Sequence, residues 1–489
     1  MINVRKTSRL LAMPVLWMGA VQAVFGVLSF TFFHDQVTRA FLLPAAGMML
    51  AAALIYLMTK KIELGGVSFR DALAFATLTW VITGLLGALP IINVTHVRFV
   101  DGVFESISAL TTTGATVLTG LDHMPPSFLM YRQFLQWMGG LGVVIFVVAV
   151  LPMLNIGGMR LLKAETPGPM KDDRLSPRIA NTAHYLWLVY ISLTVLCALC
   201  YYWAGMSAFD AIGHSFTTLS TGGFSTHDAS MGYFNSHRIL AISNLFMMAG
   251  AISFALHFRV FSRLGRWRVR WWLYWRDEET RTFVVIVLVL AMIFTGYLFA
   301  NRHYDSLAVT FSYALFHVIS FITSTGFGAA DFASWPPAAC FLLVIAGYLG
   351  GCSGSTAGGN KIVRNIITLK SIRNQLRQLI HPYGVFSLRY QGGRVDYDVR
   401  SSVMSFMTLS AATSTAITVL LVATGLDFWS AFSAAAACLN VLGPGFGVVG
   451  SNFAPVSDTG TWILSAAMIL GRLEYFTVLA LLLPAFWRR

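Results

Sequence analysis

Charged residues are scarce in this sequence. Asp, Glu, Lys and Arg make up only 11% of its 489 residues, against roughly 25% in an ordinary soluble domain. This shortage excludes a water-soluble protein of this size, because too few charges are present to cover its surface. The chain is instead 56% hydrophobic, with a mean hydropathy of +0.68. We therefore predict an all-α polytopic membrane protein.

Side chains that carry out chemistry are also few and dispersed. Cys197 and Cys200 form a Cys-x-x-Cys pair inside an apolar run, with no second pair or nearby histidine, which predicts helix packing. The eleven histidines are not clustered, and we expect His214 and His317 to pack rather than to bind a metal. A membrane enzyme needs convergent His, Asp, Glu or Cys at membrane depth, so we predict that the chain is not an enzyme. The glycine-rich segment before Lys361 lacks the order of a nucleotide-binding loop, and no organic cofactor is expected.

Basic residues outnumber acidic ones and give a net charge of +13. Of the 34 Lys and Arg residues, 28 fall in six clusters at the ends of apolar segments. The clusters are Arg5 to Arg9, Lys60 to Arg70, Arg160 to Arg178, Arg259 to Arg281, Lys361 to Arg400, and Arg488 with Arg489. This alternation predicts membrane orientation, with both termini cytoplasmic, rather than a nucleic-acid partner. The outer loops, among which we place Glu105 and Arg132, are then acidic and concentrate cations.

Ten apolar segments are long enough to span a bilayer. They cover residues 10–33, 40–59, 71–93, 133–155, 182–204, 238–258, 283–301, 338–360, 401–425 and 460–486. The first follows a basic start but has no clear small-residue cleavage site, so we predict a retained helix rather than a signal peptide.

After the first two spans, the chain repeats four times with a period of about a hundred residues. Each unit has a span, a short apolar stretch on the outer side, a glycine-containing turn and a second span. The turns read Thr111-Thr-Thr-Gly-Ala-Thr116, Leu219-Ser-Thr-Gly-Gly-Phe224, Thr323-Ser-Thr-Gly-Phe-Gly328 and Asn440-Val-Leu-Gly-Pro-Gly445. Equating Gly114, Gly222, Gly326 and Gly443 gives intervals of 108, 104 and 117 residues. The stretches 101–110, 209–219, 314–322 and 428–439 are too short to span, so they predict half-membrane helices.

Four such turns around one axis can hold a dehydrated cation. Non-helical backbone at membrane depth is tolerated only when it is buried in protein or lines a water-filled path. Glycine permits backbone angles at which successive carbonyl oxygens point the same way, and rings of carbonyls replace the hydration shell of an ion. One Ser/Thr-x-Gly turn alone is also a common loop, but its repetition favours a filter. The fourth turn lacks a hydroxyl and would contribute backbone only.

Several longer motifs resemble the TrkH-type subunit of the Trk/Ktr/HKT potassium transporters. Besides the first, second and fourth turns, they are Phe134-Leu-Gln-Trp-Met-Gly-Gly140, Ala164-Glu-Thr-Pro-Gly-Pro169, Gly350-Gly-Cys-Ser-Gly-Ser-Thr-Ala-Gly-Gly359 and Gly471-Arg-Leu-Glu-Tyr-Phe-Thr477. The resemblance implies two N-terminal helices followed by four helix–pore helix–helix repeats around one potassium pathway. The resemblance therefore assigns residues 1–69 to the two N-terminal helices. Residues 70–180, 181–281, 282–397 and 398–489 form the repeats, and the third contains a gating loop.

The resemblance also assigns the potassium filter residue by residue. The filter residues would be Thr112, Thr113, Gly114, Ser220, Thr221, Gly222, Ser324, Thr325, Gly326, Val441, Leu442 and Gly443, flanked by Thr111, Leu219, Thr323 and Asn440. In the family, serine at the first filter glycine accompanies sodium permeation. Glycine at position 114 therefore favours potassium, although a sodium-permeable variant stays open because the third turn is one of several variants.

Two further features of the sequence interrupt the membrane spans. The resemblance implies that the glycine-rich part of the eighth span is an intramembrane gate, with Gly351, Gly354, Ser355, Gly358 and Gly359 in the loop. A flexible turn at a helix end is the alternative. Arg472 lies inside the last apolar run, where a charge is costly. It matches the family's pore-lining arginine, which hinders cation passage, and a structural ion pair with Glu474 or another acid is the alternative.

We therefore predict gated potassium uptake through an inner-membrane pore, driven by the electrochemical gradient. Moving one charge inward gains about 2.3 kcal/mol per 100 mV, so an inside-negative potential suffices. A proton or sodium symporter is the main alternative. A receptor or scaffold would not need four filter-like turns. The resemblance further implies a homodimer and a cytosolic nucleotide-binding regulatory subunit of the TrkA type, while the aromatic and basic segment Arg259 to Arg281 fits either a membrane interface or a docking surface.

Overall fold

The computed structural model describes residues 4–62, 69–149, 176–261 and 270–487. Several sequence predictions reach outside these ranges. They are the end of the span 133–155, the motif from Ala164, the cluster Arg488 with Arg489, and parts of the clusters Lys60 to Arg70, Arg160 to Arg178 and Arg259 to Arg281. The described chain is almost entirely helical, apart from a two-stranded antiparallel hairpin of β1 (Arg389–Tyr390) and β2 (Gly393–Arg394). The prediction of an all-α fold is confirmed.

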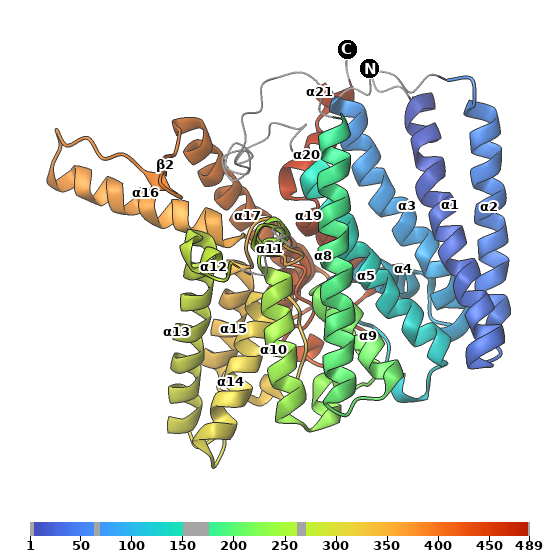
Figure 1. Cartoon of the computed structure of the whole chain (residues 1–489), viewed down its shortest axis with the longest axis horizontal. Helices are drawn as coiled ribbons and strands as arrows, with labels where there is room; N and C mark the ends of the chain where they lie inside the picture. The colour runs from blue at the N-terminus through green and yellow to red at the C-terminus, as the bar shows by residue number, and fades with distance from the viewer. Residues whose placement is uncertain (1–3, 63–68, 150–175, 262–269, 488–489) are drawn as a thin grey trace.

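Two N-terminal helices pack side by side at one edge of the molecule (Figure 1). They are α1 (Val4–Leu28), extended by a π-helical turn at Ser29–Phe33, and α2 (Thr38–Thr59). Phe25 of α1 and Phe41 of α2 both lie against the ring of Tyr131. This aromatic contact joins the N-terminal pair to the rest of the core.

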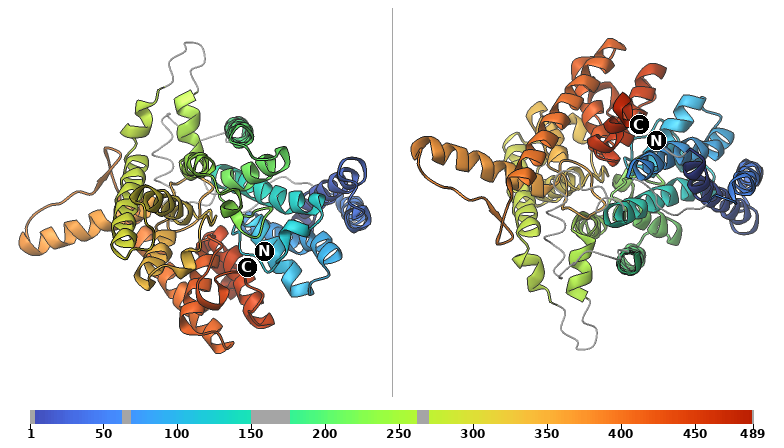
Figure 2. Two further views of the ribbon diagram at one scale, coloured as in Figure 1. Left: turned by 90° about the horizontal axis from the view of Figure 1, so that it is seen from below. Right: turned by 90° about the horizontal axis from the view of Figure 1, so that it is seen from above.

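Four short helices, each flanked by a helix on either side in the chain, form the body of the molecule. The short helices are α4 (Phe99–Leu110), α9 (Ala208–Leu219), α14 (Leu307–Ile322) and α18 (Phe428–Leu439). Their flanking helices are α3 (Phe69–Thr95) and α5 (Pro126–Ala149), α8 (Ser176–Trp203) and α10 (His237–Ala251), α13 (Glu278–Ala300) and α15 (Pro337–Leu349), and α17 (Tyr397–Ala423) and α19 (Asp458–Arg472). Seen from below and from above, the four sets of one short helix and its two flanking helices follow one another around a common centre (Figure 2).

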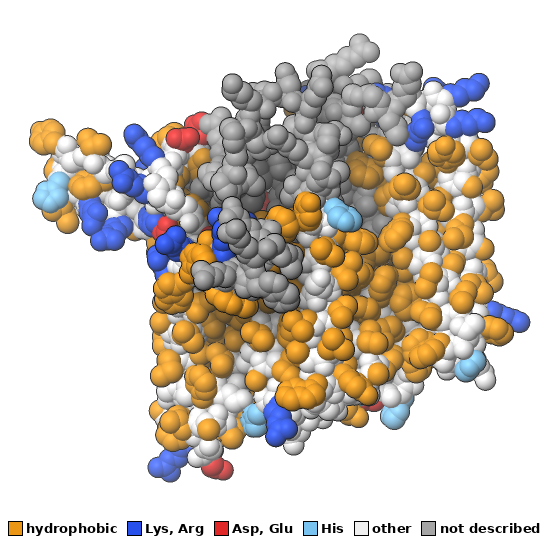
Figure 3. All heavy atoms as spheres, viewed as in Figure 1, with side chains coloured by type: hydrophobic (Ala, Val, Ile, Leu, Met, Phe, Trp, Pro, Cys, Tyr) orange, Lys and Arg blue, Asp and Glu red, His pale blue; other side chains and the backbone are white. Residues whose placement is uncertain are grey.

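Short elements complete the connections. After the turns the chain passes through 3₁₀ segments at Leu121–His123, Ser230–Phe234, Phe332–Ser334 and Gly447–Val449. The remaining helices are α11 (Phe254–Phe261), α12 (Trp272–Arg276), α16 (Ile362–Ile380), α20 (Tyr475–Leu482) and α21 (Pro484–Trp487). Helix α16 projects away from the body (Figures 1 and 2). Hydrophobic side chains cover the flank of the body, as a membrane protein requires (Figure 3).

The spans differ in detail from the ten predicted. The described residues contain six helices long and apolar enough to cross a membrane, or up to eight if each bent pair counts as one. The pair α10 and α11 bends by 99°, and the pair α19 and α20 bends by 118°. Helix α15 stops at Leu349 because Gly350 has a φ of 74°, outside the right-handed helical region. The break at Gly350 agrees with the interruption predicted from the glycines of the eighth span, whereas the bends after Ala251 and Arg472 were not predicted.

Candidate functional site

All four short helices end in the same way. The first residue beyond the C-cap is Thr112, Thr221, Ser324 or Val441, with φ between 52° and 57°. The N–H of the following residue donates to the carbonyl five residues earlier, at 2.8 Å in each case. This is the Schellman motif, in which a left-handed residue lets the backbone satisfy the last helical carbonyls.

The residue type at this left-handed position is unusual. Glycine normally occupies it, whereas here two threonines, a serine and a valine do. A left-handed conformation costs an L-residue roughly 1–2 kcal/mol, and it persists only where the surroundings over-determine the backbone. Four copies of the same strained turn therefore indicate that the surrounding packing holds this backbone for a function.

The common helix ends correct the predicted alignment of the second turn by one residue. Leu219 is the last residue of α9, so Ser220 is the C-cap that corresponds to Thr111, Thr323 and Asn440. Gly223, with a φ of 77°, then corresponds to Gly114, Gly326 and Gly443, whose φ values are 82°, 79° and 100°. Gly222 occupies the position of Thr113, Thr325 and Leu442. Two adjacent glycines made either alignment possible from the sequence, and Gly223 was missed.

The four turns close into one ring. A Cβ on Gly114 would overlap the carbonyl oxygen of Gly222, and one on Gly223 would overlap that of Thr325. A Cβ on Gly326 would likewise overlap the oxygen of Leu442, and one on Gly443 would lie 2.6 Å from the oxygen of Thr113. Each glycine is therefore required by the close approach of the next turn, and the fourth contact returns to the first. We call this arrangement the turn ring.

A non-helical loop, residues 350–361, lies against the turn ring, and we call it the gate loop after the role predicted for it from the sequence. The Thr356 hydroxyl lies 3.2 Å from that of Thr221 and 3.0 Å from the carbonyl oxygen of Leu219. The Gly358 N–H donates to the Ser324 hydroxyl at 2.5 Å. A Cβ on Gly358 would overlap the carbonyl oxygen of Asn440. The gate loop thus contacts three of the four turns.

The broken helices around the gate loop supply its backbone partners. Helix α10 ends at Ala251, and the carbonyls of Gly250 and Ala251 accept hydrogen bonds from the N–H groups of Thr356 and Cys352 at 3.2 and 2.8 Å. These are orphan carbonyls of a helix end, which need partners when buried. The carbonyl of Gly354 accepts from Phe254 N–H at 3.0 Å.

The remaining predicted loop residues make close local contacts. Ser355 Oγ donates to the Cys352 carbonyl at 2.6 Å, and Gly351 accepts from Ile362 N–H at 3.0 Å. Gly359 has a φ of 75°, and a Cβ there would lie 2.6 Å from the Gly350 Cα. The loop is packed on both sides rather than being a free turn.

Arg472, the last residue of α19, also contacts the gate loop. Its Nη1 donates to the Thr356 carbonyl at 2.9 Å, while Nε and Nη2 are buried and have no hydrogen-bond partner among the residues that the structure describes. Glu474 pairs instead with Arg364, at 2.8 Å. The alternative pairing of Arg472 with Glu474 is therefore wrong, and in the described part of the chain no carboxylate forms an ion pair with this arginine.

A buried carboxylate joins the gate loop to the first turn of α16. Glu279, in the first turn of α13, accepts hydrogen bonds at one oxygen from Ser353 N–H at 2.8 Å and Val363 N–H at 3.1 Å. Neighbouring Glu278 pairs with Lys370 near the surface. Glu279 was missed in the sequence analysis, because about seventy residues separate it from the loop.

The structure corrects the placement of Glu105 and Arg132 in outer loops. Both are fully buried, at 0% exposure, because α5 begins at Pro126 rather than near residue 133 and so includes Arg132. Their side chains form an ion pair of 2.5 Å behind the turn ring. Gln136, one turn further along α5, donates to the Gly222 carbonyl at 2.8 Å. Polar residues inside an apolar helix were the sequence signal for this cluster.

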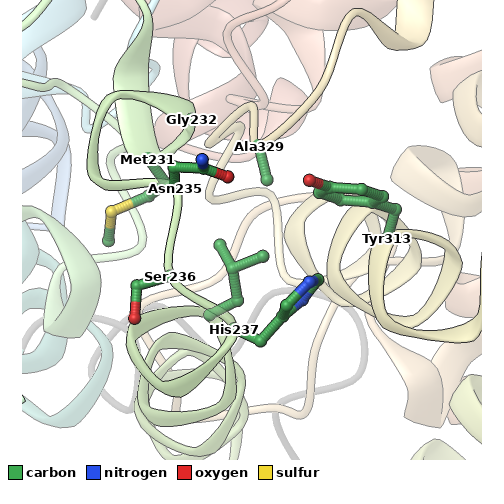
Figure 4. Close-up of a pocket in the computed structure, with 8 residues that line it drawn as sticks. Met231, Gly232, Asn235, Ser236, His237, Tyr313 and Ala329 are labelled. Carbon is green, nitrogen blue, oxygen red and sulfur yellow. The ribbon is translucent and has the colours of Figure 1, made fainter. Parts of the chain in front are cut away.

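A small open pocket lies outside the turn ring. It is formed by the segment around Met231 and Asn235, the start of α10 with His237, and Tyr313 of α14, with Ala329 on its rim (Figure 4). The His237 ring contacts the Ser312 hydroxyl at 2.9 Å. This pocket borders the segments that follow the second and third turns and contains none of the predicted site residues.

The long apolar helices around the turn ring define this chain as a polytopic membrane protein with a central four-part site. Residues 34–488 match the TrkH family of cation transport proteins, and the chain belongs to that family. It is 41% identical to the Trk system potassium uptake protein TrkH of Salmonella typhimurium, with 100% of both chains covered. It is 45% identical to the protein of the same name from Vibrio parahaemolyticus, over 86% of each.

A solved structure shows the same fold over the whole chain. The crystal structure of the potassium transporter TrkH from Vibrio parahaemolyticus matches with a TM-score of 0.91 at 38% sequence identity. The match covers 100% of both chains. The helical fold is therefore that of this solved family member.

Proposed function

We propose that this chain takes up potassium ions through one pore whose filter is the turn ring. The observation that carries the proposal is the closed contact of four strained turns, each glycine lying against a carbonyl of the next turn. In each turn the residues on either side of the middle one have positive φ, an alternation that directs successive carbonyls to the same side. Family membership and the potassium uptake relatives support potassium as the substrate.

The proposed filter residues follow the corrected alignment. They are Thr112, Thr113, Gly114, Thr221, Gly222, Gly223, Ser324, Thr325, Gly326, Val441, Leu442 and Gly443, with Thr111, Ser220, Thr323 and Asn440 as the C-caps before them. The fourth turn offers Val441 and Leu442, so its ligands would be backbone carbonyls alone.

Tracer flux into vesicles tests this proposal. The purified chain is reconstituted, a membrane potential is imposed, and rubidium or potassium uptake is measured with sodium as competitor. Potassium-selective uptake driven by the potential alone is expected. Uptake that requires a proton or sodium gradient would show that the chain is a symporter rather than a pore driven by the membrane potential. Absence of flux, even with the regulatory subunit added, would overturn the proposal.

The gate loop and Arg472 are proposed to control this pathway from the side opposite the outer loops. The loop contacts three turns and is tied to Arg472, Glu279 and the end of α10. Holding the loop in place narrows the path below the turn ring, and the charge of Arg472 opposes cations there.

Substitution of Glu279 by alanine should raise the basal potassium flux by about tenfold, because hydrogen bonds to a charged group contribute roughly 1.5–3 kcal/mol. Alanine removes the acceptor of the Ser353 and Val363 N–H groups, so the gate loop and the start of α16 lose their attachment to α13. Glu279→Gln should stay near the unsubstituted flux, since its amide oxygen can accept both N–H groups. Glu278→Gln is the matched control. An alanine variant that folds normally and conducts no faster would remove the gate assignment.

Partners and location are proposals of the same kind. Helix α16 projects from the body and exposes Leu369, Ile372, Leu376 and Leu379, which supports a homodimer through this helix. A TrkA-type nucleotide-binding subunit would bind at the cytosolic face. Light scattering of the purified chain, alone and with that subunit, tests both.

We place the protein in the bacterial inner membrane with both ends cytoplasmic. Helix α1 starts and α21 ends on one face of the molecule, and several Lys and Arg side chains lie on that face and on α16 (Figures 1 and 3). A reporter fused to the C-terminus should be active only in the cytoplasm; activity on the outer side would reverse the topology.

A further inference from the structure

The segments that leave the four turns share one contact. In every turn, the backbone N–H three residues after the left-handed glycine donates to a buried side chain. Val117 donates to Glu105 at 3.1 Å, Ala329 to His317 at 3.3 Å, and Phe446 to Ser433 at 2.9 Å. In the second turn, Thr226 donates to the Gln133 side-chain oxygen at 3.0 Å, with that amide in its hydrogen-bonded orientation.

Four different chemical groups therefore perform one structural task. Glu105 and His317 both lie nine residues before the glycine of their turn, and Ser433 lies ten before. His214, also nine residues before its glycine, contacts the Ser225 hydroxyl at 2.9 Å. The two histidines are thus buried and hydrogen-bonded to the segments that leave the turns. We call the residues that follow the left-handed glycine of each turn its outer limb. Because each of these contacts holds an outer limb in place, the position of the turn depends on these side chains.

The contact in the first turn is the strongest, because it contains an ion pair. Arg132 Nε lies 2.9 Å and Nη2 2.5 Å from one oxygen of Glu105, whose carboxylate also accepts from the Thr116 hydroxyl at 3.0 Å. Hydrogen bonds between charged partners are shorter and stronger than neutral ones. This pair holds Thr116 and Val117, the second and third residues after Gly114.

The same arginine reaches the second turn. Its guanidinium lies 4.0 Å from the ring centroid of Phe224, the residue directly after Gly223. The Phe224 N–H donates to Gln136 Oε1 at 3.1 Å, and Gln136 also binds the Gly222 carbonyl. Helix α5 therefore connects the outer limbs of two neighbouring turns through a continuous set of buried contacts.

We propose that the buried Glu105–Arg132 pair is a selectivity-determining positioning pair, which fixes the spacing between the first two turns of the ring. This inference rests on the proposed potassium function. Distinguishing two cations of different size requires that the carbonyls keep their separation, and a loosened limb lets them close around the smaller ion. Neither side chain touches the ion; both act through the backbone.

The double substitution Glu105→Met/Arg132→Met tests the pair. Replacing a buried ion pair by apolar groups of similar size is commonly neutral for stability, so this variant is expected to fold. The potassium-to-sodium permeability ratio, measured by tracer flux in vesicles, should fall by about tenfold, which corresponds to roughly 1.4 kcal/mol. The thermal unfolding midpoint should fall only modestly, because methionine offers no acceptor to the Val117 N–H and the Thr116 hydroxyl.

A milder variant covers the case in which the double substitution prevents folding. Thr116→Val removes the hydroxyl that donates to Glu105 and keeps the side-chain shape, and it should lower the ratio by a factor of about three, or roughly 0.7 kcal/mol. Arg98→Gln is the matched control, since Arg98 pairs with Asp101 on the same helix but is 56% exposed and has no contact with the turns. Its ratio should not change.

The outcomes separate this inference from the proposed function. If the unsubstituted chain conducts selectively and a folded variant without the pair has the same ratio, the positioning role is overturned and the potassium function stands. If Thr116→Val is the only folded variant, an unchanged ratio there overturns the role equally. Absence of selective flux in the unsubstituted chain would instead refute the proposed function.

Discussion

The Gly114→Ser substitution is expected to lower the potassium-to-sodium permeability ratio by at least about tenfold, or roughly 1.4 kcal/mol. Gly114 has a φ of 82°, and a Cβ there would overlap the carbonyl oxygen of Gly222. Serine therefore adds both a strained backbone and a displaced carbonyl in the neighbouring turn. Ion competition in the vesicle flux assay measures the ratio.

Gly120→Ser provides the matched control for this prediction. Gly120 has a similar φ of 74°, but a Cβ there meets no atom within 4 Å. The backbone strain is thus present without the displaced carbonyl, and selectivity should be retained. Equal ratios for the Gly114 variant and the unsubstituted chain would show that the first turn is not part of the filter.

The Arg472→Ala variant is expected to conduct potassium at least about tenfold faster. A like charge at about 8 Å costs a cation roughly 2 kcal/mol when the effective dielectric constant is about 20. Alanine also removes the hydrogen bond to the Thr356 carbonyl, which ties the gate loop to α19. Potential-driven tracer uptake, at matched protein content, measures the change.

Arg472→Gln separates the charge from the tether. Glutamine is neutral but can still donate a hydrogen bond to Thr356. Because we expect the charge to be the larger barrier to cations, the flux of this variant should resemble that of the alanine variant. Arg472→Lys keeps the charge and should remain slow. An alanine variant that is no faster than the unsubstituted protein would assign Arg472 a purely structural role.

The sequence predicted the all-helical membrane fold and the location of the four turns, because apolar length and glycine punctuation are local signals. The alignment of the second turn failed for an equally local reason. Gly222 and Gly223 are adjacent, and only the helix end at Leu219 decides which of them is left-handed. The bends after Ala251 and Arg472 were also missed, since hydropathy averaged along a span does not register a break of a few residues.

The contacts around the turn ring could not be predicted because they are tertiary. Glu105 and Arg132 are 27 residues apart, and as single charges they resembled outer-loop residues. Their burial becomes understandable only when α4 and α5 are placed side by side. Glu279 is a similar case, because its partners lie in the third unit's gate loop rather than near it in sequence. The roles of the filter and gate residues stay predictions until flux is measured.

The single-chain construction of the turn ring has a consequence for how selectivity can change. In a ring assembled from identical subunits, every substitution appears in all positions at once. Here carboxylate, amide, imidazole and hydroxyl groups hold equivalent backbone positions in the four quadrants. One mutation therefore alters one quarter of the ring, so ion preference can be adjusted in small, independent steps. Duplicated quadrants that stay joined are free to diverge in chemistry while preserving one shared geometry.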